Sequence, residues 1–571
     1  MTHLLSSYER ENTAKQLANL KLDVLVIGGG ITGAGILLDA TSRGMTVGLI
    51  EMQDFAAGTS SRSTKLVHGG LRYLKQLEIK LVAEVGRERA IVYENGMHVT
   101  TPVWMLLPIV DGGTYGRFAT SLALFVYDTL ARVRRRERHK MLDVNQALSI
   151  EPLLRASGLK GAGYYVEYRT DDARLTLENI KEAVHRGGLA LNYTRALSFL
   201  TRENKVVGVR AQDVMTGNQY EIHAKHIVNA TGPWVDHLRG EDGWRGKKSI
   251  RHTKGVHLVV DESRFPLQSA VYFDVSDGRM VFAIPRDGKT YIGTTDTDYQ
   301  GDLVHPTMSV SDRDYLLACV NEMFPSVALT AEDVESSWAG VRPLIQEEGK
   351  SPSEVSRRDE VFVSPSGLIT IAGGKLTGYR KMARKVVNLV SKRLARDEER
   401  RLGTCQTARI RICGGQFEDE DDFERFIEDE VRLGVDLGLT EAEALRLTRR
   451  YGSNVQRVFA HIDEARSAAS ASFGLPPGVL AELMYGMHEE MVMSPADFFI
   501  RRTGALYFNV EFVHRFQHGV TEYMRQELRW SDVVTEYFRD DLACRVREAI
   551  FPNHEAEGSQ ITHPFLKRTD S

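Results

Sequence analysis

The chain has 571 residues, of which 42% are hydrophobic and 26% are charged, and its net charge is −4. This length allows two to four domains around a large core, and the near-neutral charge argues against a protein that binds nucleic acid in bulk. The four cysteines form no C-x-x-C pair, so the sequence predicts no zinc or other metal site and no redox dithiol.

The sequence also indicates a compartment. A low number of cysteines in a long chain is typical of a reducing environment. The N-terminal residues lack the charged and then apolar pattern of a signal peptide, and no run of 18 apolar residues is present to span a bilayer. We therefore expect a cytoplasmic protein.

The first strong motif is a glycine turn. Residues 22–27 form a short apolar run that is typical of a buried parallel strand. Gly28, Gly30 and Gly33 follow with G-x-G-x-x-G spacing. Gly28 permits the tight turn, Gly30 lets the backbone approach a pyrophosphate, and Gly33 lets the next helix pack closely on the sheet.

The following residues complete a dinucleotide-binding pattern. A helix is predicted over residues 31–43, with Thr32 in its first turn and its positive end directed at the phosphates. A second strand is predicted over residues 45–50. Glu51 then stands about 20 residues past the glycines, where an acid accepts the ribose hydroxyls. Because a 2′-phosphate would repel this acid, the pattern argues against NADP.

A small loop rich in hydroxyl groups follows the acid. Residues 57–65 (AGTSSRSTK) include Ser61, Ser63 and Lys65. Simple NAD dehydrogenases continue at this point into another strand and helix. A loop that offers hydroxyls and backbone amides suits the longer, extended FAD molecule.

The sequence here resembles a known family. Residues 23–35 (DVLVIGGGITGAG) and 58–74 (GTSSRSTKLVHGGLRYL) are similar to the FAD-dependent glycerol-3-phosphate dehydrogenases, and most similar to the aerobic bacterial type. The resemblance extends over nearly the whole chain. It implies an α/β fold (α+β overall) with an FAD-binding Rossmann-like domain of the glutathione-reductase-like superfamily, an antiparallel substrate-binding sheet and a helical C-terminal domain.

The next stretch ends in an unusual segment. A helix is predicted over residues 74–95 and a strand over 102–110. Residues 118–130 are apolar and precede a basic run that comprises Arg132, Arg134, Arg135, Arg136, Arg138 and Lys140. Two interpretations stay open: a helix lying in the membrane interface with its basic end near anionic lipid, or a buried core helix with a solvated basic end.

The middle of the chain is rich in strands. Strands are predicted over residues 189–200 and 205–213, and Gly217-Asn218 signals a hairpin. A further strand ends in Ala230, Thr231 and Gly232, which in this class of protein close on the adenosine side of the cofactor. Three more strands at 254–260, 281–285 and 291–296 suit an antiparallel substrate sheet. Residues 311–324 and 331–336 look helical.

A second strand, glycine turn and helix occur late in the chain. Residues 367–372 form the strand, and a helix runs to about residue 394. The turn between them contains Gly374, Lys375, Leu376 and Thr377. A helix N-terminus at this point would stabilise negative charge on a reduced flavin ring.

The remaining residues are predicted to form helices almost throughout. We expect residues 1–400 to form the FAD-dependent oxidoreductase region and residues 401–571 the helical C-terminal domain. Within the first region, the expected FAD-binding part comprises about 21–110, 150–235 and 355–400, and the expected substrate part comprises about 111–149 and 236–354.

Arginines are the natural clamp for a phosphorylated substrate, because the guanidinium fork matches phosphate oxygens. The resemblance assigns this role to Arg342, in a Gly-Val-Arg-Pro-Leu motif, and to Arg358, although the neighbouring Arg357 makes that register ambiguous. Arg72 and Tyr73 match the family motif that lies beside the flavin and the substrate.

The sequence offers more than one candidate for the proton acceptor. We expect His257, because its ordinary pKa is near neutral and its Lys-Gly-x-His context resembles that of the family. A histidine in a strand can equally be structural, and Lys375 competes for the role. Arg72 is a third candidate catalytic residue, and Thr294 and Thr295 are expected to donate hydrogen bonds to the substrate.

The resemblance implies oxidation of sn-glycerol 3-phosphate to dihydroxyacetone phosphate in glycerol catabolism. With no second glycine fingerprint and no dithiol, electrons must pass to a diffusible acceptor. We favour a membrane quinone, reached by peripheral contact with the inner face of the cell membrane. The alternatives are an oxygen-dependent glycerophosphate oxidase, a flavin amine or amino-acid oxidase, and a non-catalytic FAD-binding protein. The oligomeric state stays open, with a homodimer among the options.

Overall fold

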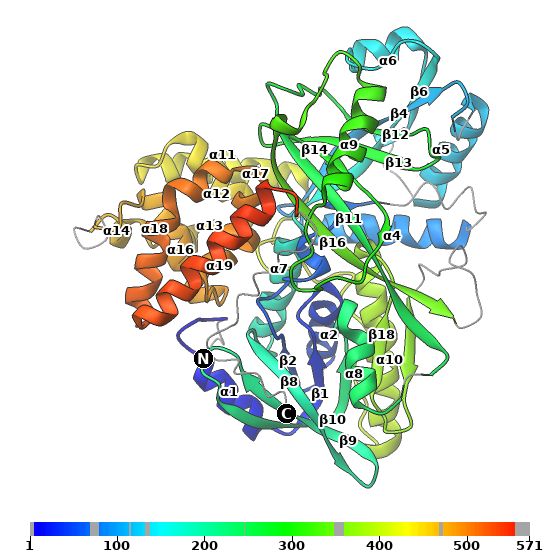
Figure 1. Ribbon diagram of the computed structural model, residues 1–571. Coiled ribbons are helices and arrows are strands. Elements are labelled where there is room, and N and C mark those ends of the chain that lie inside the picture. The colour runs from blue at the N-terminus through cyan, green and yellow to red at the C-terminus, as the bar shows by residue number, and fades with distance from the viewer. Residues whose placement is uncertain are drawn as a thin grey trace.

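Two β-sheets and a set of C-terminal helices make up the chain in the computed structural model (Figure 1). The structure describes residues 5–68, 79–113, 116–131, 137–244, 246–347, 359–467 and 472–553.

The first sheet is built on buried parallel strands. β1 (Leu22–Ile27) lies at its centre and pairs in parallel with β2 (Val47–Ile50) and with β10 (Gln219–Asn229). β7 (Leu189–Leu191) extends the sheet beyond β2, and β18 (Ile369–Ala372) extends it beyond β10. Every residue of β1 and β2 is buried, as expected for strands covered on both faces.

Three antiparallel strands complete this sheet. The predicted hairpin at Gly217-Asn218 is present, because β9 (Lys205–Asp213) pairs with β10 across it. β8 (Thr194–Arg202) pairs with β9, and β17 (Glu360–Val363) pairs with β18.

Two helices begin at the carboxyl-terminal edge of the parallel strands of the first sheet. α2 (Ile31–Ser42) and α10 (Tyr379–Glu398) pack against each other. They approach closely at Gly35, where an added Cβ would lie 2.9 Å from the Tyr379 ring. Both helices begin directly after a glycine turn, so the two turns lie at the same end of the sheet.

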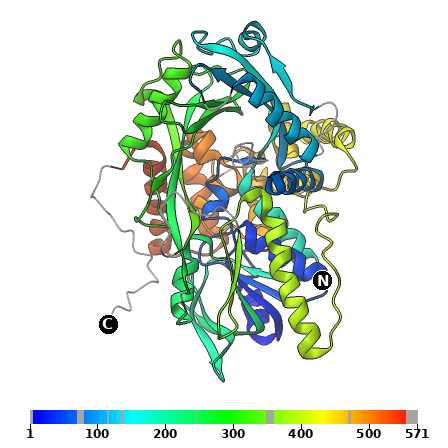
Figure 2. The ribbon, with the colours of Figure 1, turned by 90° about the vertical axis from the view of Figure 1, so that its right-hand side faces the viewer.

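The second sheet has ten strands and is mainly antiparallel. Its long strands β11 and β16 pair along most of their length and reach toward the first sheet (Figure 2). One pair, β4 with β12, is parallel. The strands are β3 (Leu66–Val67), β4 (Thr100–Val110), β5 (Lys140–Leu142), β6 (Leu159–Thr170), β11 (Lys248–Asp261), β12 (Ala270–Asp274), β13 (Met280–Arg286), β14 (Lys289–Gly293), β15 (Thr297–Asp298) and β16 (Val334–Glu347).

Two details differ from the sequence prediction. β4 and β6 belong to the second sheet, whereas the predicted boundaries grouped their residues with the FAD-binding part. The helix predicted over residues 331–336 is a single 3₁₀ turn at Ala331–Asp333, after which β16 begins at Val334. The β-strand prevails there because residues 334–347 pair with β11.

The other described helices that precede residue 400 lie around both sheets. α5 has two faces: Leu124 and Tyr127 are buried, whereas Phe118, Leu122 and Phe125 are 84%, 53% and 62% exposed. These helices are α1 (Arg10–Asn19), α4 (Ile79–Asn95), α5 (Arg117–Ala131), α6 (Val144–Ile150), α7 (Asp172–His185), α8 (Val235–Glu241) and α9 (Val310–Met323).

The C-terminal helices gather on one side of the molecule (Figure 1). They are α11 (Glu420–Asp436), α12 (Glu441–Tyr451), α13 (Val455–Phe459), α14 (Ile462–Ala465), α16 (Pro477–Glu489), the π-helix η8 (Asp497–Arg502), α17 (Ala505–Phe508), α18 (Val510–Glu527) and α19 (Asp532–Ile550). There, α17 and α19 pack against β16 of the second sheet, and η8 packs against α7. In the described part of the chain, no helix combines the length and the apolar character needed to cross a membrane.

Candidate active site

The glycine turn after β1 tolerates no side chain at two of its positions. Gly28 has a φ of +114°, and an added Cβ would lie 2.5 Å from the carbonyl oxygen of Ala230. An added Cβ at Gly33 would lie 1.9 Å from the carbonyl oxygen of Gly28. The turn, the strand end at Ala230 and α2 are therefore packed backbone against backbone, as a phosphate-binding turn requires.

The polar groups around this turn are already oriented. Ser60 Oγ accepts a 2.9 Å hydrogen bond from the backbone N–H of Ile31, at the start of α2. Glu51 accepts bonds from the backbone N–H of Gly29 at 2.7 Å and of Gln53 at 2.9 Å. Burial raises the pKa of Glu51, and these two hydrogen bonds oppose the rise.

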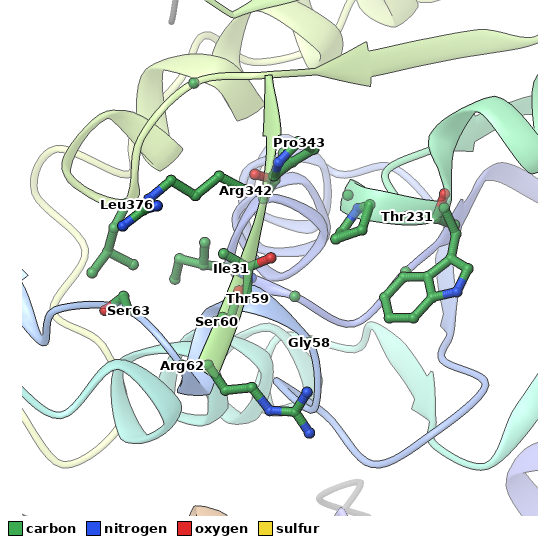
Figure 3. A pocket seen from close by; sticks show the side chains of 18 of the residues that line it. Ile31, Gly58, Thr59, Ser60, Arg62, Ser63, Thr231, Arg342, Pro343 and Leu376 are labelled. Atoms are coloured by element: carbon green, nitrogen blue, oxygen red, sulfur yellow. The ribbon is translucent and has the colours of Figure 1, made fainter. Parts of the chain in front are cut away.

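A cavity of about 780 Å³ begins at this turn and reaches the second sheet. Figure 3 shows side chains from the glycine turn, the hydroxyl-rich loop and β16 gathered around it. The predicted residues that line it are Gly28, Gly30, Thr32, Glu51, Ser63, Ala230, Thr231, Gly232, His257, Thr294, Arg342, Gly374, Lys375, Leu376 and Thr377.

Four predicted residues that the structure describes do not line this cavity: Gly33, Ser61, Lys65 and Thr295. Lys65 is buried, and its Nζ lies 2.6 Å from Asp172 and 3.0 Å from the Ser61 carbonyl oxygen. Ser61 and Lys65 therefore hold the loop in place, and their expected role as cofactor contacts stays a prediction. Thr295 Oγ1 accepts the N–H of Val256 inside the sheet.

Three predicted residues lie outside the described residues. They are Arg72, Tyr73 and Arg358. Their roles remain predictions from the resemblance.

His257 lies in the cavity wall, in the space left by a glycine. It pairs with Gly293 across β11 and β14, and an added Cβ at Gly293 would lie 2.1 Å from the imidazole. The ring stacks on Trp338 with centroids 4.7 Å apart, and Nε2 lies 3.0 Å from Thr64 Oγ1. Nδ1 has no hydrogen-bond partner among the described residues. Burial, Arg342 and Lys65 hold the pKa of His257 well below its ordinary value, so the ring is neutral.

Arg342 occupies a similar space beside a second glycine. An added Cβ at Gly255 would lie 2.2 Å from Arg342 Nη2. Nη2 donates to Thr294 Oγ1 at 2.9 Å, and Nη1 lies 3.1 Å from Asp296. The guanidinium is therefore fixed in the cavity wall with a partly exposed counter-ion.

The second glycine turn, which precedes α10, is hydrogen-bonded to the segment that follows β3. Thr377 Oγ1 donates a 3.2 Å hydrogen bond to the carbonyl oxygen of His68. This bond joins the turn before α10 to the residue that follows β3. Lys375 and Leu376 line the cavity on the same side.

Several cavity residues were not predicted from the sequence. Ser60 and Thr64 stand in the hydroxyl-rich loop, but only the structure shows which hydroxyls turn inward. His68 precedes the Gly-Gly-Leu-Arg motif, and Trp234 follows the Ala-Thr-Gly strand end, so both stand beside quoted motifs. Tyr272 and Phe282 stack 4.0 Å apart in the wall and had no local signal.

The fold and the site together define a class. A parallel sheet with a phosphate-binding glycine turn, an acid at the end of the second strand and an arginine with a neutral histidine in the same cavity describe a dinucleotide-dependent oxidoreductase.

Comparisons with known proteins give the particular family. Residues 23–380 match the family model for FAD dependent oxidoreductases, and residues 405–534 match the model for the C-terminal domain of alpha-glycerophosphate oxidase. The aerobic glycerol-3-phosphate dehydrogenase of Bacillus subtilis is 54% identical over 97% of this chain and 99% of its own length. That of Staphylococcus haemolyticus is 52% identical over 96% of this chain and 99% of its own length.

Solved structures agree. The glycerol-3-phosphate dehydrogenase of Bacillus halodurans, complexed with FAD, is 49% identical and has a TM-score of 0.84 over 97% of this chain and 100% of that chain. An L-alpha-glycerophosphate oxidase of Mycoplasma pneumoniae, at 17% identity and a TM-score of 0.54, shares the fold over 68% of this chain and 97% of that chain. The chain belongs to the FAD-dependent aerobic glycerol-3-phosphate dehydrogenases. The resemblance, the fold class and FAD as the cofactor are thereby confirmed.

The residues present fit FAD. Two backbone amides orient Glu51. At the start of α2, the backbone at Gly33 packs closely against the Gly28 carbonyl group. The cavity continues from this point to the turn before α10. Glu51 and Thr32 would hold the adenosine and phosphate end of FAD, and residues 375–377 would hold the other end. When bound, FAD supplies the hydride acceptor.

Replacing Gly33 with alanine is expected to remove FAD from the purified protein. The added Cβ must displace the Gly28 carbonyl group, which lies 1.9 Å away, and so distorts the phosphate turn. We expect FAD to bind about tenfold or more weakly, equivalent to about 1.4 kcal/mol of binding free energy, and the purified protein to lose flavin accordingly. Gly116→Ala is the control, since its Cβ would meet nothing within 4 Å. Equal flavin content in Gly33→Ala and the wild type would contradict this account of the turn.

Proposed function

We propose that this enzyme oxidises sn-glycerol 3-phosphate to dihydroxyacetone phosphate by transfer of the C2 hydride to FAD. The observation that carries the proposal is the pairing of a fixed guanidinium and a neutral imidazole in one cavity wall. Arg342 and His257 both stand on the two paired strands and both line the cavity that reaches the turn before α10.

The proposed roles follow from the chemistry of each group. Arg342 binds the phosphate, because its planar fork matches phosphate oxygens. Thr294 orients Arg342 and lies in the cavity to hydrogen-bond the substrate. His257 accepts the hydroxyl proton, and being neutral it is already in the basic form. Lys375 is the alternative acceptor.

The predicted substrate contacts outside the described residues remain part of the proposal. Arg72, Tyr73 and Arg358 would add positive charge and a hydroxyl to the phosphate clamp. Thr295 is withdrawn from the substrate contacts, because its hydroxyl is bonded inside the sheet.

Anaerobic titration of the oxidised holoenzyme with sn-glycerol 3-phosphate tests this function. We expect the oxidised-flavin absorbance band to bleach, with dihydroxyacetone phosphate formed in equal amount. Glycine and other amino acids should leave the band unchanged. A band that stays oxidised with sn-glycerol 3-phosphate, or that bleaches with an amino acid, would contradict the proposal.

For the second half of the reaction, we propose a membrane quinone as the electron acceptor. The support is the exposed apolar face of α5, formed by Phe118, Leu122 and Phe125. These residues recur at helical spacing, and the exposed basic residues Arg138 and Lys140 follow. Such a face suits shallow insertion into an anionic membrane surface.

Dioxygen is the second candidate acceptor, because the C-terminal residues match the glycerophosphate oxidase domain model. The two acceptors are separable. Mixing the substrate-reduced enzyme with a quinone should reoxidise the flavin without forming peroxide. If air instead reoxidises the flavin faster than the quinone does, and forms peroxide in stoichiometric amount, the oxidase is favoured.

Removing the apolar face of α5 is expected to release the enzyme from lipid. The triple variant F118S/L122S/F125S should lose binding to anionic vesicles by about tenfold or more, since each buried apolar side chain contributes about 1.5–3 kcal/mol. Reduction of the flavin by substrate should be unchanged. Val533→Ser, at a residue that is 68% exposed elsewhere, is the control. Unchanged vesicle binding in the triple variant would refute the membrane role of α5.

A further inference from the structure

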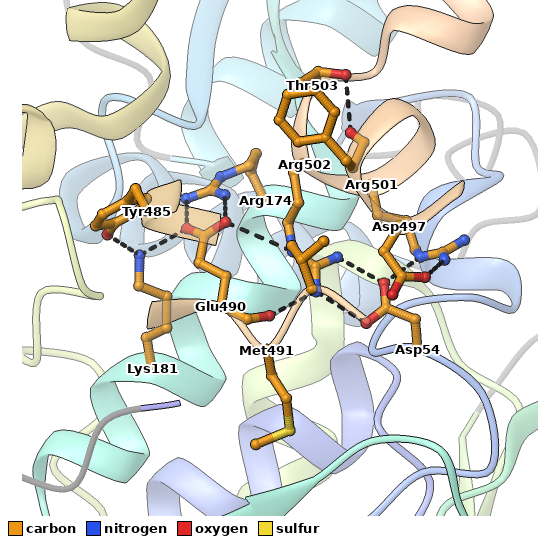
Figure 4. Close-up of polar contacts among 12 residues, drawn as sticks. Asp54, Arg174, Lys181, Tyr485, Glu490, Met491, Asp497, Arg501, Arg502 and Thr503 are labelled. Atoms are coloured by element: carbon orange, nitrogen blue, oxygen red, sulfur yellow. Dashed lines mark hydrogen bonds and ion pairs between the residues drawn. The ribbon is translucent and has the colours of Figure 1, made fainter. Parts of the chain in front are cut away.

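A buried carboxylate in the loop of residues 51–56, here called the cofactor loop, is held by the C-terminal helices. Asp54 is 1% exposed and stands three residues after Glu51. It accepts hydrogen bonds from Arg501 at 2.5 Å and from Arg502 at 2.6 and 2.9 Å (Figure 4). A further bond comes from Asn192 at 2.9 Å. Both arginines belong to η8, more than 440 residues away in the sequence.

The same arginines are tied into the rest of the C-terminal cluster. Arg501 also pairs with Asp497 at 2.5 Å, and Arg502 donates to the carbonyl oxygen of Glu490 at 2.7 Å. Glu490 in turn binds Arg174 at 2.7 Å and Lys181 at 3.0 Å, both on α7. The network therefore joins η8, the loop after α16, α7 and the cofactor loop.

The cofactor loop transmits the position of Asp54 to the glycine turn. The N–H of Ala56 donates to the Gly29 carbonyl oxygen at 3.1 Å, and Glu51 accepts the Gly29 N–H. On the other side, the N–H of Thr194 donates to the Glu51 carbonyl oxygen at 2.6 Å. A movement of Asp54 would therefore move Glu51, which is expected to bind the ribose.

Asp54 stays charged in the interior only because both arginines lie beside it. Burial alone would raise the pKa of Asp54, but Arg502 and Arg501 outweigh it and keep the carboxylate charged. Arg502 has no exposed side-chain surface, and Arg501 is 4% exposed. Removing one member of such a buried set leaves an uncompensated charge, which forces the local structure to rearrange.

We propose that Arg501 and Arg502 are positioning residues for FAD: they hold Asp54, and through it the Glu51 loop, in the conformation that binds the cofactor. The C-terminal helices then form part of the cofactor site without lining the cavity. This inference depends on FAD as the cofactor and not on the proposed substrate or acceptor.

The first test measures FAD dissociation from the holoenzyme by the fluorescence of the released flavin. We expect Arg502→Met and Asp54→Asn each to weaken FAD binding about tenfold or more, equivalent to about 1.4 kcal/mol. The double variant R502M/D54N should lose less FAD-binding free energy than the sum of the losses in the two single variants, because both substitutions act through one contact.

The matched control removes a buried charge from the C-terminal helices that does not touch the cofactor loop. Glu482 has no exposed side-chain surface and accepts from Arg446, Arg450 and Tyr451, all within that cluster. Glu482→Gln should lower thermal stability but leave FAD dissociation within about twofold of the wild type. Equal FAD loss in Glu482→Gln and Arg502→Met would overturn the proposal, since general destabilisation would then explain both.

A second measurement uses the wild-type chain and decides the question even where a variant fails to fold. If η8 positions the cofactor loop, FAD must by linkage stabilise the docking of η8. We expect amide hydrogen exchange over residues 490–503 to be slower with FAD than after its removal, while exchange around Glu482 stays the same. Slower exchange confined to residues that line the cavity would overturn the proposal.

Discussion

Replacing Arg342 with methionine is expected to lower kcat/KM for sn-glycerol 3-phosphate by about three orders of magnitude, or about 4 kcal/mol. The guanidinium is held by Thr294 and Asp296 before any substrate arrives, so little entropy is lost when it binds a phosphate. Steady-state kinetics of the purified holoenzyme measure the effect. Much of it should appear in KM, because phosphate binding also holds the substrate in its ground state.

Two comparisons separate phosphate binding from a general defect. Arg251→Met removes an arginine from the same sheet that pairs with Asp298 and does not line the cavity, and it should leave kcat/KM within about twofold. Glycerol, which lacks the phosphate, should be oxidised by Arg342→Met as poorly as by the wild type. A variant that loses equal factors with glycerol and with glycerol 3-phosphate would show that Arg342 does not bind phosphate.

The glycine turn could be predicted from the sequence because its function depends on local backbone geometry. Gly28 and Gly33 are required by contacts within a few residues and with one neighbouring strand end. The strand and helix boundaries around them follow from hydrophobic periodicity, and β1 and α2 match the prediction closely.

The direction of side chains in the hydroxyl-rich loop could not be predicted. Lys65 has a φ of +55°, which breaks the simple alternation of an extended segment. Its partner, Asp172, lies 107 residues further along the chain. Lys65 turns inward because it pairs with Asp172 at the start of α7, whereas Ser60 and Thr64 line the cavity.

The glycines that make room for the two key side chains were also missed. Gly255 and Gly293 carry no turn signal and stand in strands, where glycine is usually unfavourable. Their purpose appears only once the register is known, because Gly293 lies opposite His257 and Gly255 lies beside Arg342. Register between strands distant in sequence is set by the whole sheet.

Helix α5 combines parts of both interpretations that its sequence allowed. Leu124 packs against Gly163 of the sheet, as a core helix would. Phe118, Leu122 and Phe125 face outward, as an interfacial helix would. An apolar run without strong periodicity does not reveal which side chains the sheet will cover.

Replacing His257 with glutamine is expected to lower kcat by about 10²–10⁴-fold, the usual contribution of a general base. Glutamine keeps a polar group that reaches Thr64, but its amide cannot act as a base near neutral pH. Flavin reduction in single turnover measures the effect directly. A loss of less than about fivefold would assign proton transfer to another group, with Lys375 the next candidate.

The pH dependence gives an independent check on His257. Because burial, Arg342 and Lys65 lower its pKa, the acid limb of kcat/KM in the wild type should lie below the ordinary histidine value of about 6.5. The same shift affects stability: the unfolded state binds a proton near pH 6.5 and the folded state does not. The contribution of His257 to stability is therefore complete above that pH and is lost as the pH falls toward the lowered folded-state pKa.

His98 shares the lowered pKa but does not line the cavity, so His98→Gln should remove part of this acid instability while leaving the kcat/KM profile unchanged. An acid limb that moves in His98→Gln, or that persists unchanged in His257→Gln, would show that the profile reports some group other than His257.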